Sequence, residues 1–120
     1  MPGTADHPIT IAAAPDRIRV TFAGQVVADS REALVLKEAS YPPVSYIPRK
    51  DVNLALLRRT ERKTHCPYKG EASYYTIHAG GRVAENAIWS YENPRADMAA
   101  IAGYVAFYPD RVDSIETLPG

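Results

Sequence analysis

Hydrophobic and polar residues alternate with a period of two along most of this chain, which is the pattern of half-buried β-strands. In the clearest stretch, Ile18, Val20 and Phe22 alternate with Arg19 and Thr21. A short turn at residues 23–24 follows, and residues 25–30 are expected to return as the hairpin partner of this strand. The alternation predicts a mostly β protein with no long helix.

The same pattern, interrupted by glycine and proline, predicts the remaining elements. Pro48 suits the first turn of a short helix over residues 49–52, and residues 97–102 are expected to form a second helical turn. About nine short strands in all indicate two antiparallel sheets, packed as a sandwich or closed as a barrel. Besides 17–22 and 25–30, the predicted strands are residues 33–36, 44–47, 56–63, 73–78, 82–91, 104–108 and 112–115.

The length of 120 residues fits a single domain with one core. Residues 1–15 are small, polar and interrupted by prolines, so we expect a disordered or loosely attached N-terminal tail before a single β domain over residues 16–120. No apolar run approaches the roughly 20 residues that span a bilayer. The first residues also lack the basic region of a secretory signal. We therefore expect a cytoplasmic protein without a membrane partner.

The formal net charge is zero, but the positive charges are concentrated in the middle of the chain. Residues 49–70 carry seven Lys or Arg against two Asp or Glu. This excess can attract an anionic ligand, but it is too small and too mixed for a nucleic-acid footprint. The charged run over residues 58–63 is interpreted as a guard that protects an exposed edge strand from aggregation.

The single cysteine, Cys66, excludes an internal disulfide and a multi-cysteine metal site. A metal bound by His65, Cys66 and His78 would lack a fourth ligand, and we expect neither a metal nor a cofactor. With Lys69 nearby, the thiol can act as a nucleophile, or it can be a small buried hydrophobe at a strand end. His65 is a poor partner for it, because successive strand residues face opposite ways.

Charged side chains near two predicted turns are candidates for ligand binding. Arg49 can hold a carboxylate or phosphate with its planar fork, or it can form a salt bridge with Glu85 or Asp51. Lys69 either joins that site or is solvated. Glu85 can supply an acid–base group, although one carboxylate is a weak signal.

Aromatic residues with polar atoms supply the remaining candidates. Trp89 is best explained as core, whereas Tyr46 and Tyr74 either line a pocket or fill the edge of the core. The expected pocket lies between the two sheets near the turn at residues 66–70, because strand ends meet at the rim of a sandwich. Its predicted walls are Tyr46, Arg49, Lys69, Tyr74 and Trp89.

Five segments together resemble one known family. They are residues 20–30, 46–52 (Tyr-Ile-Pro-Arg-Lys-Asp-Val), 66–74 (Cys-Pro-Tyr-Lys-Gly-Glu-Ala-Ser-Tyr), 87–94 (Ala-Ile-Trp-Ser-Tyr-Glu-Asn-Pro) and 103–109 (Gly-Tyr-Val-Ala-Phe-Tyr-Pro). In this order they cover nearly all of residues 17–115 and resemble the bacterial and fungal family called domain of unknown function 427. The resemblance implies a β-tent fold, in which two antiparallel sheets lean together as a sandwich.

The resemblance leaves two functions open. The four-cysteine zinc site of related tent folds is not carried over to a chain with one cysteine. The nucleotidyltransferase-like label of the family also lacks its motifs here, namely paired carboxylates after Gly-Ser and a glycine-rich phosphate loop. A binding module for a small polar or anionic molecule in an aromatic-lined pocket is the leading reading. The alternative is an enzyme that uses Cys66 as a nucleophile or redox thiol tuned by Lys69. Either protein is expected to be a monomer or a homodimer.

Overall fold

The computed structural model describes residues 3–4 and 6–119, and they form short strands joined by tight turns and 3-10 helices. The longest helical segment has six residues, and no helix in the described part of the chain is long and apolar enough to cross a membrane. The elements in chain order are β1 (Gly3–Thr4), β2 (His7–Ala13), β3 (Arg17–Phe22), β4 (Gln25–Ser30), β5 (Leu34–Glu38), β6 (Val44–Tyr46), η1 (Arg49–Asp51), η2 (Leu54–Leu56), β7 (Leu57–Cys66), β8 (Gly70–Ala79), β9 (Arg82–Ser90), η3 (Ala96–Ile101), β10 (Val105–Phe107), η4 (Pro109–Arg111) and β11 (Ser114–Leu118).

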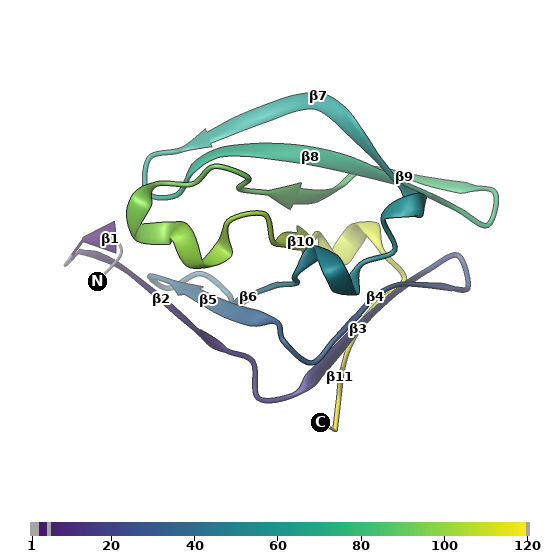
Figure 1. The fold of residues 1–120 in the computed structure, drawn as a ribbon, viewed down its shortest axis with the longest axis horizontal. Helices are drawn as coiled ribbons and strands as arrows, with labels where there is room; N and C mark the ends of the chain where they lie inside the picture. The colour runs from purple at the N-terminus through teal and green to yellow at the C-terminus, as the bar shows by residue number, and fades with distance from the viewer. Residues whose placement is uncertain (1–2, 5, 120) are drawn as a thin grey trace.

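The strands form three antiparallel sheets, with orders β1-β2-β5-β6, β10-β9-β8-β7 and β11-β3-β4. In Figure 1, β7 and β8 lie along the top, β2, β5 and β6 lie at the lower left, and β3, β4 and β11 lie at the lower right. The mostly β class is confirmed, but there are three sheets rather than the two that we expected. The first sheet is separate because β5 pairs with the N-terminal strand β2 on one side and with β6 on the other, and not with β3 or β4.

The prediction of a loose tail over residues 1–15 is wrong for residues 7–13, which form β2. This strand pairs in register with β5, from Ile9 opposite Glu38 to Ala13 opposite Leu34. Ile9 is 0% exposed and packs against the core together with Ile11, two positions along the same face. The small and polar neighbours of these isoleucines suggested disorder, but the pairing with β5, the buried Ile9 and the partly buried Ile11 anchor the strand. Residues 1, 2 and 5 lie outside the described part of the chain.

The core consists of two clusters on opposite faces of the β10-β9-β8-β7 sheet. The first, here called the Phe22 cluster, contains Tyr75 and Ile88, which are paired across β8 and β9. The second, called the Tyr46 cluster, contains Tyr74 and the partly buried Trp89, which form the next pair. Because adjacent strand residues face opposite ways, this sheet is buried on both sides.

Irregularities in β7 and β9 meet across the sheet. The pairing of β7 with β8 shifts between Arg59 and Lys63, and the intervening residues 60–62 have no register partner. In β9, Asn86 has a left-handed backbone with φ of 49°, which asparagine tolerates better than most residues. The Thr60 hydroxyl donates a hydrogen bond of 2.7 Å to the Asn86 side-chain oxygen. These two bulges turn Arg62 over the Tyr74 ring, with 4.9 Å from the guanidinium carbon to the ring centroid.

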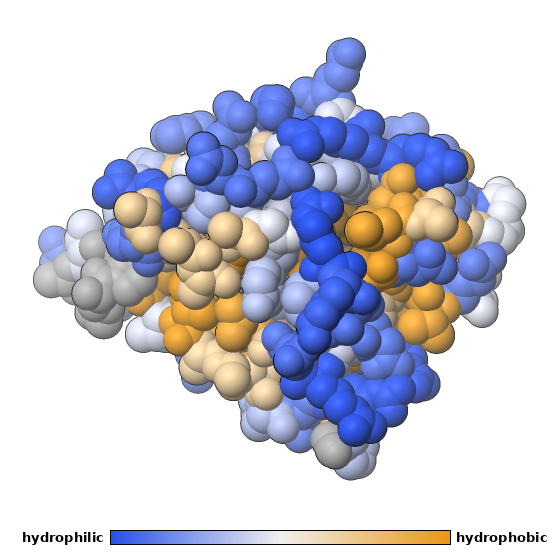
Figure 2. Space-filling view, in the orientation of Figure 1, coloured by the Kyte–Doolittle hydropathy of each residue, from blue (hydrophilic) through white to orange (hydrophobic). Residues whose placement is uncertain are grey.

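The exposed apolar side chains are dispersed over the surface. On the face shown in Figure 2, a band of hydrophilic residues separates two hydrophobic areas. The large apolar side chains with substantial exposure come from five different elements or turns and are Val26, Tyr41, Leu54, Val83 and Ile115. Scattered apolar residues are normal on a soluble surface, so the cavities are the better candidates for a functional site.

Candidate functional site

Arg49 belongs to a polar network on the Phe22-cluster face of the central sheet. Its guanidinium donates hydrogen bonds to the Tyr75 hydroxyl at 2.9 Å and to the Glu92 carboxylate at 2.8 Å. Arg59 pairs with the other Glu92 oxygen at 2.6 Å. Burial raises the pKa of Glu92, but the hydrogen bond from Tyr75 and the two guanidinium charges outweigh it and lower the pKa. Arg49 therefore forms a salt bridge, with Glu92 rather than with either carboxylate expected from the sequence.

Lys69 belongs to the Tyr46-cluster face of the same sheet. Its side chain pairs with Glu38, and its nitrogen lies 5.9 Å from the centroid of the Tyr91 ring. Lys69 is only 7% exposed, so it is not a solvated lysine. The structure therefore does not bring Arg49 and Lys69 together, because each has its own acidic partner on a different face. Within residues 3–4 and 6–119, neither Arg49 nor Lys69 lines any of the clefts described below.

Tyr46 and Trp89 do meet, as the sequence analysis expected. The indole nitrogen of Trp89 donates a hydrogen bond of 3.2 Å to the Tyr46 hydroxyl, and the rings are nearly perpendicular at 87°. Tyr46 is 1% exposed, and its burial raises the pKa of the hydroxyl. Tyr46 is thus a core residue that orients Trp89. Trp89, which was expected both to fit the core and to wall the pocket, is partly buried and lines a cavity.

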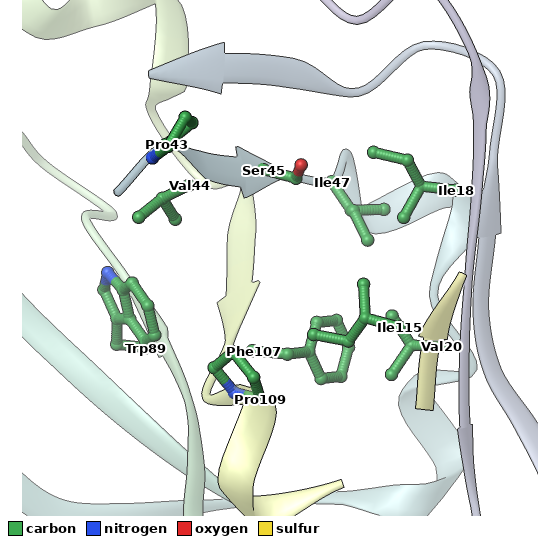
Figure 3. Close-up of a pocket in the computed structure, with 10 residues that line it drawn as sticks. All are labelled: Ile18, Val20, Pro43, Val44, Ser45, Ile47, Trp89, Phe107, Pro109 and Ile115. Carbon is green, nitrogen blue, oxygen red and sulfur yellow. The ribbon is translucent and has the colours of Figure 1, made fainter. Parts of the chain in front are cut away.

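Trp89 forms one wall of an apolar pocket of about 340 Å³. Figure 3 shows Trp89, Pro43 and Val44 on one side, Ile18, Ile115 and Val20 on the other, and Pro109 beside Phe107. The Ser45 hydroxyl is the one side-chain polar group besides the indole nitrogen in this lining. The complete lining is Ile18, Val20, Pro43, Val44, Ser45, Ile47, Trp89, Phe107, Pro109 and Ile115.

A second cleft, of about 610 Å³, adjoins this pocket, and the two share Pro43, Val44 and Pro109 as a common wall. Cys66 lies on the second cleft and is half-buried. The lining combines apolar, aromatic and ionisable side chains, namely His7, Glu38, Tyr41, Pro42, Pro43, Val44, Cys66, Pro67, Tyr68 and Pro109.

His7 and Glu38 are functional candidates that the sequence analysis missed. The His7 Nε2 atom lies 2.7 Å from the Glu38 carboxylate, and the imidazole stacks on the Tyr68 ring at 4.1 Å. Burial raises the pKa of Glu38, but its contacts with Lys69 and His7 outweigh the burial, so the pKa is lowered. One signal could have identified His7. It lies two residues before Ile9 and four before Ile11, and such positions share one face of a strand.

This second cleft can support thiol chemistry in principle. The cleft is lined by a thiol from Cys66, an imidazole from His7 and the Glu38 carboxylate that contacts this imidazole, which are the residue types that surround a nucleophile in thiol enzymes. His65, the histidine next to Cys66 at the end of β7, is exposed, and successive strand residues face opposite ways. In the described part of the chain, no group of three or more His, Cys, Asp or Glu side chains is arranged to hold a metal ion.

Tyr74 and Glu85 lie near a third cleft, which is polar and has a volume of about 420 Å³. Glu85 lines it directly, away from Arg49 and Lys69. Tyr74 is buried beneath Arg62, and its hydroxyl is 2.8 Å from the Thr64 hydroxyl. Burial raises the pKa of Tyr74, but hydrogen bonding and the Arg62 charge lower it by more. The predicted site residues are therefore divided among three clefts and the Arg49 network.

Comparison with models of known protein families gives a match over most of the chain. The model of a family described as a domain of unknown function, DUF427, matches residues 10–117. A search of curated proteins finds no match. The family match covers nearly the whole chain, so the resemblance read from the five sequence segments is confirmed.

Proposed function

The chain belongs to the DUF427 family, and we propose that it is a binding module for a small amphipathic molecule. The observation that carries this proposal is the common wall of Pro43, Val44 and Pro109 between the apolar pocket and the Cys66 cleft. A molecule that occupies both cavities can place an apolar body in the first and one polar group beside His7 and Glu38 in the second, whose other lining residues are mostly apolar. This assignment keeps the aromatic-lined pocket expected from the sequence but moves it away from Arg49.

The apolar pocket suits the body of such a ligand. Its volume of about 340 Å³ falls in the range of small-molecule sites, which are mostly apolar with a few polar groups. Each methylene that moves from water into this pocket is worth about 0.8 kcal/mol. The Trp89 ring and the branched side chains opposite it provide the contacting surface.

The polar head is recognised by His7. Since the ionised Glu38 can only accept hydrogen bonds, Nε2 of His7 is the donor in their contact. Nδ1 of a neutral His7 is then an acceptor, and none of the residues that the structure describes bonds to it. This arrangement favours a head group that donates a hydrogen bond, such as a hydroxyl or an amide.

The test uses the emission of Trp89, the only tryptophan in the chain. Titration with straight-chain 1-alkanols from pentanol to decanol should change this emission, and the dissociation constant should fall about fourfold per methylene until the pocket is full. Val44→Arg, in the common wall, should abolish the response. Val83→Arg is the matched control, because Val83 is 55% exposed and lines neither cavity. No response from the unmodified protein, or an equal loss in both variants, would contradict the proposal.

A second candidate is an enzyme that uses Cys66 as a nucleophile or redox thiol. One observation favours it: Cys66 lines the same cleft as His7, which Glu38 holds at 2.7 Å. If this candidate is right, the rate at which Cys66 is alkylated depends on His7.

We also infer a cytoplasmic location and a monomeric or dimeric protein. A single free cysteine suits a reducing compartment, where disulfides are rare. Cell fractionation tests the location, and light scattering coupled to size exclusion measures the oligomeric state.

A further inference from the structure

We propose that the polar third cleft, between the β7 bulge, β9 and η4, is a binding site for a small oxyanion held by Arg62 and Arg111. The cleft has a volume of about 420 Å³ and is separate from the two cavities of the proposed function. Its lining is almost entirely polar and consists of Arg62, Glu85, Asn86, Tyr108, Asp110 and Arg111.

Among the residues that the structure describes, no carboxylate forms an ion pair with the guanidinium group of Arg62 or of Arg111. Across the residues that the structure describes, the ion pairs within 4.0 Å involve other cations. Five arginines, namely Arg17, Arg19, Arg49, Arg59 and Arg82, have a carboxylate within 3.2 Å. Two guanidinium groups on one cleft, neither held in an ion pair by a described residue, offer the planar donors that bind a carboxylate or a phosphoryl group with two hydrogen bonds.

Both arginines are nevertheless positioned by the fold. Arg111 donates a hydrogen bond of 2.9 Å to the Glu85 backbone oxygen, which ties η4 to β9. Arg62 lies over the Tyr74 ring, and its backbone nitrogen donates to the Thr60 hydroxyl at 3.3 Å. These contacts use only part of the donor capacity of each guanidinium, which has five N–H groups. The remaining donors are available to a ligand without a large loss of side-chain freedom.

Tyr108 supplies a third donor. Its ring packs against Trp89 at 4.5 Å between centroids, which holds the phenol at the edge of the cleft. Burial raises the pKa of the Tyr108 hydroxyl to about 12, helped by the neighbouring Tyr74, while Arg62 and Arg111 act in the opposite direction. The hydroxyl therefore keeps its proton at neutral pH and can donate a hydrogen bond to an anion.

The carboxylates of Glu85 and Asp110 line the same cleft and limit its affinity. Their two negative charges balance the two arginines, so the cleft has no net formal charge to attract anions from a distance. Recognition must then come from directed hydrogen bonds at short range. This balance predicts selectivity for a compact oxyanion, and it predicts that removing one carboxylate tightens binding.

Isothermal titration calorimetry with inorganic phosphate and with acetate, at constant ionic strength, tests the proposal. Arg62→Gln and Arg111→Gln should each weaken binding about tenfold, and Glu85→Gln should tighten it severalfold. Arg31→Gln is the matched control, because Arg31 is exposed, lines none of the three clefts and has no ion-pair partner among residues 3–4 and 6–119. Circular dichroism confirms that each variant is folded.

The two probes also identify the class of oxyanion. Tighter binding of phosphate assigns a phosphoryl ligand, and tighter binding of acetate assigns a carboxylate. The proposal is overturned if neither probe binds the unmodified protein, or if Arg31→Gln weakens binding as much as Arg62→Gln. It is also overturned if the double variant of Arg62 and Arg111 remains folded and binds as the unmodified protein does.

Discussion

Tyr74 and Tyr75 are neighbours in β8, and their side chains are buried on opposite faces of one sheet. Tyr75 donates to Glu92 in the Arg49 network, whereas Tyr74 lies beneath Arg62. Each tyrosine thus stands next to a different arginine. This alternation distributes the positive charge of residues 49–70 over both sides of the sheet. The charge is therefore not concentrated at a single anion site.

The pair of Lys69 and Glu38 should contribute strongly to stability, because both side chains are largely buried. Lys69→Met leaves a buried carboxylate with only His7 as a partner and should cost about 3 kcal/mol in the free energy of unfolding. The double variant Lys69→Met, Glu38→Gln should recover part of that loss. Lys50→Met is the control, since the Lys50–Glu32 pair is exposed and should matter by less than about 1 kcal/mol. Urea unfolding measures the free energy of unfolding of all three variants. An equal loss of this free energy in Lys69→Met and Lys50→Met would refute the prediction.

The pH dependence of stability should depend in part on Asp29. The hydrogen bond from Arg17, at 2.6 Å, is the main reason that the pKa of Asp29 is lowered to about 2. An unfolded aspartate has a pKa of about 3.9. The stabilisation is therefore present above about pH 4 and is lost as the pH falls toward 2.

Asp29→Asn should accordingly lower the thermal midpoint at pH 7 and change it little at pH 2. Glu61→Gln, at an exposed position of β7 without a register partner, should leave the midpoint unchanged at both pH values. Thermal unfolding followed by circular dichroism checks the pattern. An equal effect of Asp29→Asn at both pH values would rule out the Arg17 contact as its cause.

The hairpin turns of β3–β4 and β8–β9 touch at Gly80. A Cβ atom added there would lie 2.8 Å from the Ala23 backbone oxygen, and the backbone of Gly80 is left-handed with φ of 56°. Gly80→Ala should cost about 1 kcal/mol for the backbone and about 1–3 kcal/mol more for the overlap. Gly81→Ala has the same kind of backbone but open space around its Cβ, so only the first cost applies. Chemical denaturation of the two variants should therefore give different midpoints.

The reactivity of Cys66 distinguishes the two candidate functions. Alkylation by iodoacetamide at pH 7 should slow severalfold in His7→Ala if the imidazole assists the thiol. His65→Ala is the control, because His65 is adjacent in sequence but exposed. Cys66→Ala should remain folded, with a cost of about 1–2 kcal/mol for a half-buried side chain. An unchanged rate in His7→Ala would remove the support for thiol chemistry.

The positions of the strands could be read from the sequence, because burial on one face imposes a visible period. Residues 17–22 and 25–30 form β3 and β4 with the bounds expected from alternation and from the Gly24 turn. The short helix after Pro48 is likewise present as η1. Strand β2 was missed because only Ile9 and Ile11 indicate its buried face among small and polar residues.

The grouping of side chains into sites could not be read in the same way. Whether Arg62 meets Tyr74 depends on the shift of register between Arg59 and Lys63. No residue type within residues 58–63 indicates such a shift. The run was therefore interpreted only as an edge guard. Similarly, His7 and Cys66 are 59 positions apart (66 − 7), and only the pairing of β2 with β5 brings them to one cleft.

Strand β2 also has an evolutionary consequence. The segment recognisable as the family begins at residue 10, yet the imidazole on the Cys66 cleft belongs to residue 7. Two relatives could share the entire recognisable segment, including Glu38 and Cys66, and still differ in whether a histidine precedes it. The segment that defines the family and the segment that forms the proposed ligand site would then begin at different residues. Substitutions just before the recognisable segment could then change the proposed ligand site while that segment stayed constant.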